Sequence, residues 1–135
     1  MRLLLDTEIY LWFLSDSARL PGVVKTQISG ASEVYVSAAS IWEASIKIRI
    51  GKLDANPEDL VRGIQDSGFE ELPVSAEHAA AVADLPLYHR DPFDRLLVAQ
   101  AMAVPLTLLS SDEILQRYTE LVTVVRPLGP NEPAK

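Results

Sequence analysis

The sequence predicts an α/β domain in which helices pack on a mostly parallel central sheet. Short apolar runs of strand length alternate along the chain with longer amphipathic stretches of helical length, a pattern typical of this class. The chain has 135 residues, of which 48% are hydrophobic, so one domain can bury a core without a disulfide or a metal staple. It contains no cysteine, which excludes disulfide scaffolds, cysteine-ligated metal sites and thiol nucleophiles.

The first elements are a strand, two helices and a second strand. Residues 2–6 include three consecutive leucines and predict a short buried strand, and the stretch 8–14 that follows is expected to be helical. A second helix is expected over 20–29, because Pro21 near its start fits the first turn. The residues of 34–37 favour the extended conformation and predict the second strand.

Two helices follow, and each carries a boundary signal. The helix expected over 40–50 ends at Gly51, because glycine readily takes the left-handed conformation that closes a helix. The next helix has the clearest start, since Asn56 can accept the first free N–H groups and Pro57 suits the first helical position. Two acidic residues follow in its first turn, and the helix is expected to end near residues 67–68.

The second half of the chain repeats the alternation. We expect a strand over 69–74, a helix over 75–83 and a helix over 91–102 that begins with an Asp-Pro pair. The remaining segments are a strand over 106–109, a short helix over 112–117, a strand over 121–125 and a flexible, proline-rich tail over 128–135. A single domain over residues 1–127 is therefore expected.

The chain is acidic, with a net charge of −7 and an isoelectric point of about 4.7. This charge argues against a nucleic-acid binder that relies on a basic surface, and it leaves open a contact through a bound cation. The apolar stretches are far shorter than the ~20 residues that span a bilayer. Asp6 interrupts the apolar start before a signal-peptide core develops, so we expect a cytoplasmic protein with no membrane contact.

Four acidic residues occupy positions where a parallel sheet can bring them together. Asp6 ends the first strand and Asp112 follows the strand over 106–109, so both are expected at the same sheet edge. Glu43 and Asp94 lie near the starts of helices that can face that edge. Each acid alone also fits a plain capping or first-turn role.

The chemistry of such a cluster depends on a cation. Converging carboxylates repel one another and raise each other's pKa unless a cation neutralises them. A set of oxygen ligands favours Mg²⁺ or Mn²⁺ over zinc. Such a cation can clamp a phosphate and activate water for in-line attack. If the four acids converge, they therefore point to metal-assisted phosphoester chemistry.

Five segments carry a resemblance to a known family. They are residues 3–7 with Trp12, 36–43, 47–53, 89–101 and 108–112, which read LLLDT, VSAASIWE, KIRIGKL, HRDPFDRLLVAQA and LLSSD. In this order, over nearly the whole chain, they resemble PIN-domain ribonucleases, and specifically the VapC-type toxins of bacterial toxin–antitoxin pairs. The resemblance implies a three-layer sandwich around the parallel sheet.

The same resemblance assigns the site. Its acidic residues map onto Asp6, Glu43, Asp94 and Asp112, and its hydroxyl two positions before the last acid maps onto Ser110. Threonine is frequent where Ser110 stands, and His or Asn is frequent where Glu8 stands, so both positions depart from the family pattern. The presence of all four acids argues against an inactive member.

The activity that the resemblance implies is Mg²⁺-dependent endonucleolytic cleavage of RNA, with Mn²⁺ as the alternative ion. Asp6, Asp94 and Asp112 would hold one or two ions, and Glu43 would bind an ion or orient the attacking water. The implied partners are an RNA substrate, a second copy of the chain and a cognate antitoxin. The antitoxin is expected to lay a helix in an apolar groove and to present a basic residue to the acidic pocket.

Five basic residues are candidate RNA contacts. They are Lys47, Arg49 and Lys52, expected on one helix, and Arg90 and Arg95 beside the Asp-Pro motif. Alternatives stay open for two of them, because Lys47 could pair with Glu43 and Arg95 with Asp91, as surface charges commonly do.

The histidines and tryptophans have plainer expectations. His89 is expected to make a structural hydrogen bond rather than to act in catalysis, and His78 to lie at the surface. Trp12 and Trp42 stand in apolar helical patterns, so packing in the core or in a dimer is favoured over base stacking.

Two other functions compete with the ribonuclease. A haloacid-dehalogenase-like phosphatase also has an aspartate after its first strand, but it requires a second aspartate two positions on, where this chain has Glu8. A PIN-like module that binds RNA or protein without cleaving it is the other alternative, and the four retained acids disfavour it.

Overall fold

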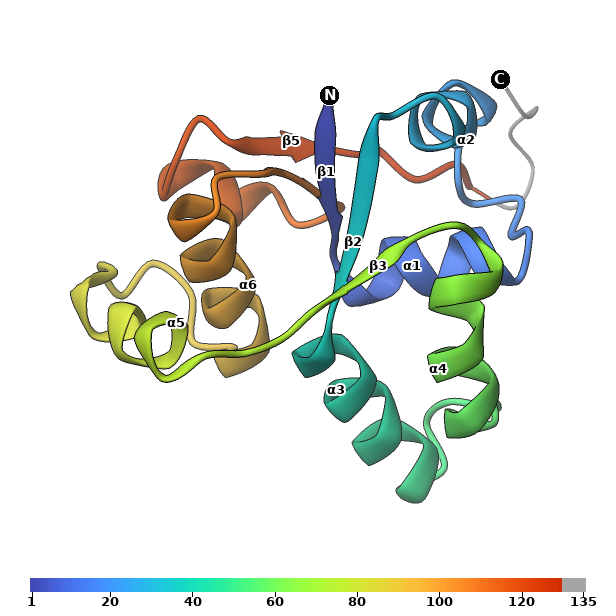
Figure 1. Cartoon of the computed structure of the whole chain (residues 1–135), viewed down its shortest axis with the longest axis horizontal. Coiled ribbons are helices and arrows are strands. Elements are labelled where there is room, and N and C mark those ends of the chain that lie inside the picture. The colour runs from blue at the N-terminus through green and yellow to red at the C-terminus, as the bar shows by residue number, and fades with distance from the viewer. Residues whose placement is uncertain (130–135) are drawn as a thin grey trace.

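The computed structural model describes residues 1–129 and contains one parallel sheet of five strands (Figure 1). The strand order is β3-β2-β1-β4-β5, which places the first strand of the chain at the centre. All neighbouring strands run parallel, so their carboxyl ends meet at one edge of the sheet. The strands are β1 (Arg2–Leu5), β2 (Glu33–Ser37), β3 (Glu70–Leu72), β4 (Thr107–Ser110) and β5 (Val122–Val124).

The helices begin and end where the sequence supplies boundary residues. Asn56 caps α4 by accepting hydrogen bonds from the N–H groups of Glu58 and Asp59, and Gly51 takes a φ of 77° just after α3 ends. Within residues 1–129, no helix combines the length and apolar character needed to cross a bilayer. The helices are α1 (Thr7–Leu14), α2 (Gly22–Ser29), α3 (Ala38–Arg49), α4 (Pro57–Asp66), α5 (Ala76–Ala81) and α6 (Pro92–Ala103), with 3₁₀ turns η1 (Val82–Asp84) and η2 (Glu113–Arg117).

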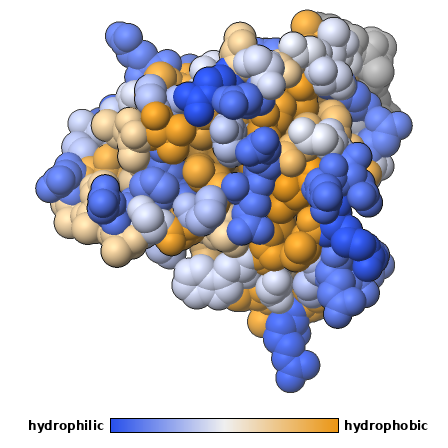
Figure 2. Space-filling view, in the orientation of Figure 1, coloured by the Kyte–Doolittle hydropathy of each residue, from blue (hydrophilic) through white to orange (hydrophobic). Residues whose placement is uncertain are grey.

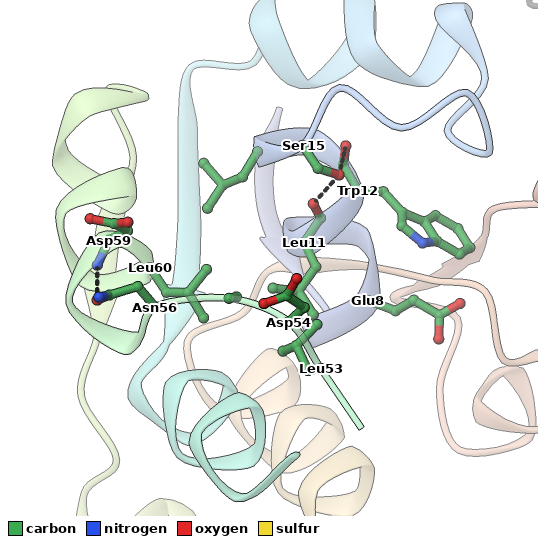
Figure 3. Close-up of a pocket in the computed structure, with 11 residues that line it drawn as sticks. Glu8, Leu11, Trp12, Ser15, Leu53, Asp54, Asn56, Asp59 and Leu60 are labelled. Carbon is green, nitrogen blue, oxygen red and sulfur yellow. Dashed lines mark hydrogen bonds between the residues drawn. The ribbon is translucent and has the colours of Figure 1, made fainter. Parts of the chain in front are cut away.

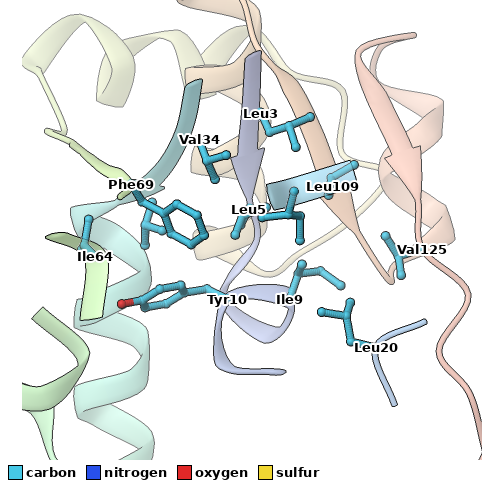
Figure 4. Close-up of a cluster of buried hydrophobic side chains, with 12 residues drawn as sticks. Leu3, Leu5, Ile9, Tyr10, Leu20, Val34, Ile64, Phe69, Leu109 and Val125 are labelled. Carbon is cyan, nitrogen blue, oxygen red and sulfur yellow. The ribbon is translucent and has the colours of Figure 1, made fainter. Parts of the chain in front are cut away.

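Alternating side chains of the strands build a core on each face of the sheet. Leu3 and Leu5 of β1 pack with residues of α1, α2 and α4 on one face (Figure 4). Leu4 points to the opposite face and packs with Leu97 and Ala101 of α6. In Figure 1, α5 and α6 accordingly lie on one side of β1, and α1, α2 and α4 lie on the other. Burial of both faces explains why the central strand is entirely leucine after Arg2.

Each predicted strand and helix has a counterpart, so the α/β sandwich is confirmed and its sheet is wholly parallel. The boundaries differ in places. α2 starts at Gly22 rather than at residue 20, because Pro21 has an extended backbone and stands just before the first helical residue. β3 is shorter than predicted, since only three of its residues pair with β2. The short helix after β4 is the 3₁₀ turn η2.

The predicted tail over 128–135 begins with an ordered contact. Leu128 is buried, and its N–H donates a hydrogen bond to the carbonyl oxygen of Arg19 at 2.9 Å. Residues 130–135 lie outside the described residues. The domain limit at residue 127 stays a prediction.

Candidate metal centre

The carboxyl ends of two neighbouring strands bring the first two acids to the same edge. Asp6 directly follows β1 and caps α1, because its Oδ1 accepts the N–H of Ile9 at 2.8 Å. Asp112 follows the adjacent strand β4 and caps η2 by accepting the N–H of Ile114 at 3.1 Å. Because β1 and β4 are parallel neighbours, two capping residues distant in the chain face one pocket.

The other two acids come from the starts of helices. Glu43 lies on α3, which follows β2, and only 8% of this residue is exposed. Asp94 lies in the first turn of α6, where Asp91 is the N-cap and accepts the N–H groups of Phe93 and Asp94. The helix start thus fixes Asp94, and Asp91 has the capping role.

These acids surround one polar cavity of about 180 Å³. A cavity of this size holds several water molecules, or an ion with part of its hydration shell. All four acids predicted from the sequence line it. The full lining is Asp6, Thr7, Glu8, Glu43, Lys47, Asp91, Asp94, Ser111 and Asp112.

Crowding of the carboxylates disfavours their ionised forms. Burial raises the pKa of Asp6 to about 6, against the hydrogen bonds from Ser110 and Ile9 that favour its charged form. Burial also raises the pKa of Asp94 to about 7, and the negative charges of Asp91, Asp6 and Glu43 add to this effect. A cation in the pocket would reverse both shifts by favouring the carboxylates.

One oxygen in the pocket has no partner within the described chain. Glu43 Oε2 pairs with Lys47 Nζ at 3.2 Å, whereas Glu43 Oε1 is buried and makes no hydrogen bond. A buried carboxylate oxygen without a donor is costly. A divalent cation would satisfy it, and a donor set made of carboxylate oxygens suits Mg²⁺ or Mn²⁺. The residues present therefore fit a hard divalent ion.

Ser110, the last residue of β4, lies fully buried under this edge. Its Oγ accepts the N–H of Asp112 at 3.1 Å, and its hydroxyl favours the ionised form of Asp6. Ser110 thus links the two strand-end acids from below the pocket.

His89 lies closer to the site acids than a purely structural histidine would. Its Nε2 lies 2.7 Å from Asp112 Oδ2 and 3.2 Å from Asp94 Oδ2. The nearest ligand atoms of His89, Asp94 and Asp112 all lie within 4.8 Å of one another. The expected hydrogen bond exists, but its partner is the site acid Asp112, with Asp94 close beside it. The signal in the sequence was the closeness of His89 to Asp91 and Asp94.

The basic candidates separate into two groups. Lys47 lines the pocket and forms the ion pair with Glu43 that was weighed as its alternative. Arg49, Lys52 and Arg90 are exposed. Lys52 was expected on the same helix as Lys47, and this was wrong, because α3 ends at Arg49 and Lys52 lies in the turn that follows.

Arg95 differs from both expectations. It is 9% exposed, and within the described chain it does not pair with Asp91. Its Nη1 donates to the carbonyls of Pro86 and His89, and its Nη2 to those of Val82 and Leu85. The guanidinium therefore fixes the loop before α6 instead of presenting charge at the surface.

The two tryptophans differ in their exposure to solvent. Trp12 is partly buried and packs against the core, as expected. Trp42 is 62% exposed, so packing in the core of this chain was wrong for it, and packing in a dimer stays a prediction. Its ring lies against that of Phe93, with the ring centroids 5.0 Å apart. His78 is half-buried rather than at the surface, because it closes a capping box with Ser75 at the start of α5.

A second, larger cavity of about 630 Å³ adjoins the acidic pocket. Leu11 of α1, Leu53 of the loop after α3 and Leu60 of α4 converge on it (Figure 3). Glu8 lines both cavities, so the apolar groove leads to the acidic pocket. Asp54 and Asp59 also line the groove, which gives an apolar floor with an acidic rim.

Comparisons with known proteins agree with this geometry. A search of curated proteins gives no match. Chains of three solved structures share the fold. VapBC2 from Rickettsia felis bound to a promoter DNA fragment has 15% identity and a TM-score of 0.67, over 94% of this chain and 99% of that one. DNA-bound VapBC from Salmonella typhimurium has 14% identity and a TM-score of 0.65, over 92% and 96% of the two chains, and FitAB bound to the IR36 DNA fragment has 21% and 0.60, over 96% and 99%. Residues 3–121 match the family described as the PIN domain. Since this match spans most of the chain, including the strands β1 to β4 from Leu3 onward and all four acids, the chain belongs to the PIN domain family.

Proposed function

We propose that this PIN domain is a metal-dependent endoribonuclease and the toxin of a toxin–antitoxin pair, of the VapC type. The observation that carries the proposal is the pocket in which Asp6, Glu43, Asp94 and Asp112 face one another. The similar solved structures support the same function, because they are named as VapBC and FitAB complexes. The family match favours this activity over the phosphatase alternative.

The donor set fits Mg²⁺, with Mn²⁺ as the alternative. We propose that Asp6, Asp94 and Asp112 hold the cation, because their carboxylates come from the strand ends and the first turn of α6. When bound, such an ion supplies positive charge for a phosphodiester and makes a water molecule more acidic. Glu43 Oε1 has no other partner in the described chain, so it can bind the ion or accept a hydrogen bond from the attacking water.

RNA contacts are proposed for the exposed basic residues around this pocket. Lys47 offers its ammonium at the pocket wall. Arg49 and Lys52 are exposed and follow Glu43 in the sequence, and Arg90 is exposed and precedes Asp94. They would attract phosphate groups to an otherwise acidic surface. Arg95 is left out of this set, because its guanidinium is taken up by backbone carbonyls.

The antitoxin is proposed to bind in the groove lined by Leu11, Leu53 and Leu60. An apolar floor with an acidic rim suits an amphipathic helix whose polar side carries Lys or Arg. Because Glu8 lines the groove and the acidic pocket, a basic side chain at one end of such a helix could reach the site acids. This arrangement would inhibit the nuclease by filling the place of the cation.

A homodimer is proposed as the assembly. Trp42 and Ile46 of α3 and its C-cap Ile50 are exposed. They stand four residues apart and so share one side of the helix end. Figure 2, in the orientation of Figure 1, shows apolar patches between hydrophilic side chains, with a dense group of hydrophilic side chains on the side of α4. Burying such a surface between two copies would remove it from water.

Cleavage of RNA by Asp→Asn variants tests the nuclease. Asp6→Asn and Asp94→Asn keep the size of each side chain but remove the charge that a cation needs. We expect Mg²⁺-dependent cleavage of an RNA substrate to fall by about 10²-fold or more, the size of effect seen when one group that stabilises a transition state is removed. Cleavage by the wild-type protein is expected to stop when EDTA removes the ion.

The matched control is Asp84→Asn, an exposed aspartate outside the pocket, which should cleave like the wild type. Normal Mg²⁺-dependent cleavage by Asp6→Asn or Asp94→Asn would show that the acid cluster is assigned wrongly. Absence of cleavage in the wild type would favour the silent module, and hydrolysis of a small chromogenic phosphate ester would favour the phosphatase.

A further inference from the structure

His89 stands beside the acids of the proposed metal centre, and neither the family match nor the proposed function gives it a role. Its imidazole lies between two carboxylates, with Nε2 at 2.7 Å from Asp112 Oδ2 and at 3.2 Å from Asp94 Oδ2. Two roles are compatible with these distances. Nε2 could bind the cation through a lone pair, or it could carry a proton and donate it to the carboxylates.

The other ring nitrogen decides between these roles. The backbone N–H of Asp91 donates to His89 Nδ1 at 3.3 Å. A nitrogen that accepts a hydrogen bond carries no proton, so in the neutral ring the proton is on Nε2. A protonated ring nitrogen has no lone pair for a metal ion. The contact to Asp112 is therefore an Nε2–H donor bonded to a carboxylate oxygen.

The backbone of His89 is held from both sides by other residues of the chain. The N–H of His89 donates to Tyr118 Oη at 2.8 Å. Arg95 Nη1 donates to the carbonyl of His89 at 3.3 Å and to the same Tyr118 Oη at 3.2 Å. The buried guanidinium of Arg95 and the segment after η2 thus clamp this residue just before α6 begins.

We propose that His89 is a positioning residue of the metal centre, whose Nε2–H holds Oδ2 of Asp112 and lies beside Oδ2 of Asp94, so that both carboxylates stay directed at the pocket. This inference rests on the proposed metal-dependent function. Groups that hydrogen-bond to metal ligands orient those ligands and raise their affinity for the ion. Because His89 is not itself a ligand, the centre keeps an all-oxygen donor set suited to Mg²⁺.

The first test measures Mg²⁺ binding to the full chain by calorimetry. In His89→Ala the donor is lost, and we expect Mg²⁺ affinity to fall about 10–100-fold, the range for loss of a group that orients a metal ligand. In His89→Gln the side-chain amide N–H can replace Nε2–H, so affinity should stay close to that of the wild type. His78→Ala, which changes the histidine at the start of α5, is the matched control and should bind like the wild type.

The second test asks whether nitrogen binds the ion. With Mn²⁺ as the probe, pulsed electron paramagnetic resonance of the wild type should show no ¹⁴N coupling of the size that a directly bound imidazole gives. Such a coupling, lost in His89→Gln, would overturn the positioning role and make His89 a ligand. Unchanged Mg²⁺ affinity in His89→Ala would overturn it as well.

These results separate this inference from the proposed function. If the wild type binds Mg²⁺ and Asp6→Asn does not, the metal centre stands, and only the His89 variants decide the role of His89. If neither Mg²⁺ nor Mn²⁺ binds to the wild type, the proposed function and this inference both fail.

Discussion

Asp6 and Asp94 show most clearly how an acidic pocket lowers the free energy of unfolding. Both lie among other carboxylates with little exposure to water, and their pKa values rise to about 6 and about 7. Unfolded chains hold aspartate at a pKa of about 3.9. The metal-free folded protein therefore binds more protons than the unfolded chain between these values, and the pocket is unfavourable to folding once its carboxylates ionise.

This difference predicts how the stability of the metal-free protein depends on pH. Because the folded state binds the extra protons, the free energy of unfolding should fall as the pH rises from about 4 to about 7. Asp94→Asn removes the main ionisation, and one unit of pKa difference is worth about 1.4 kcal/mol. At pH 8 in EDTA we expect Asp94→Asn to raise the free energy of unfolding by on the order of 2 kcal/mol, with little change at pH 4, as measured by urea denaturation.

Asp84→Asn is the control for this measurement, since Asp84 is exposed and lies outside the pocket. Added Mg²⁺ should flatten the pH dependence in the wild type, because a bound cation favours the ionised carboxylates. Equal stabilisation by Asp94→Asn at pH 4 and pH 8 would contradict the raised pKa of Asp94.

Arg95 shows at the same scale why a residue type does not reveal its role. Next to an Asp-Pro motif it has the spacing of a surface ion pair or an RNA contact. Folding instead buries it where the carbonyls of the loop before α6 converge. Only the path of that loop over α6 decides this, and the path depends on packing between segments.

At the scale of elements, the acids of the candidate site lie at or near the starts of helices and 3₁₀ turns. Asp6, Asp91 and Asp112 each accept backbone N–H groups at the beginning of a helix or 3₁₀ turn. The caps fix where each element begins, and they thereby fix the neighbouring acids relative to the sheet edge. Asp6 and Asp112 therefore combine the capping role with the proposed metal-binding role, whereas at α6 Asp91 is the cap and Asp94 is the proposed ligand.

The contact between α1 and α4 offers a test of packing between elements. A Cβ added at Gly63 of α4 would meet Tyr10 Oη at 2.8 Å and Leu14 Cδ1 at 2.9 Å. Tyr10 cannot easily yield, because its hydroxyl donates to the carbonyl of Leu60 at 2.6 Å. We expect Gly63→Ala to lower the free energy of unfolding by up to about 2 kcal/mol, since overpacking costs about 1–3 kcal/mol and the gain in helix propensity returns about 1 kcal/mol.

Thermal and urea unfolding would measure this change. Gln65→Ala, an exposed position on the same helix, should leave the stability within about 0.5 kcal/mol. A stabilised Gly63→Ala variant would mean that α1 and α4 can separate without cost.

At the scale of the whole molecule, the apolar groove and the acidic pocket form one continuous surface. They share Glu8, and the groove is bounded by α1, the loop after α3 and the start of α4. A partner that lies in the groove, as proposed for the antitoxin, would therefore reach the acidic pocket through Glu8.

A substitution in the groove should separate inhibition from cleavage. Leu53→Arg puts a positive charge on the apolar floor of the groove, where it would repel a basic helix and fill its space. We expect this variant to keep RNA cleavage near the wild-type rate and to lose at least tenfold in affinity for the cognate antitoxin, which about 1.4 kcal/mol would produce.

Binding of the purified antitoxin and inhibition of RNA cleavage would measure these effects. Met102→Arg, at an exposed position of α6 outside the groove, should bind antitoxin like the wild type. Full inhibition of Leu53→Arg by the antitoxin would show that the partner binds elsewhere.

Much of this protein could be predicted from its sequence because the signals are local. Apolar runs, caps such as Asn56 and breakers such as Gly51 specify the elements one by one, and the order of strands and helices leads to a parallel sheet. The family segments marked Asp6, Glu43, Asp94 and Asp112, and these four residues do line one cavity. Each of these conclusions depends on residues close together in the chain or on a motif.

Tertiary structure alone decided the features that depend on contacts between distant segments. His89 meets Asp112 across 23 residues of sequence, and Arg95 is buried by a loop that its own helix supports. Trp42 is exposed although its helix has an apolar pattern, because nothing in the described chain covers that side of α3. Burial, ion pairing and pKa depend on which surfaces of the fold meet. Those contacts exist only once distant segments of the chain have packed together.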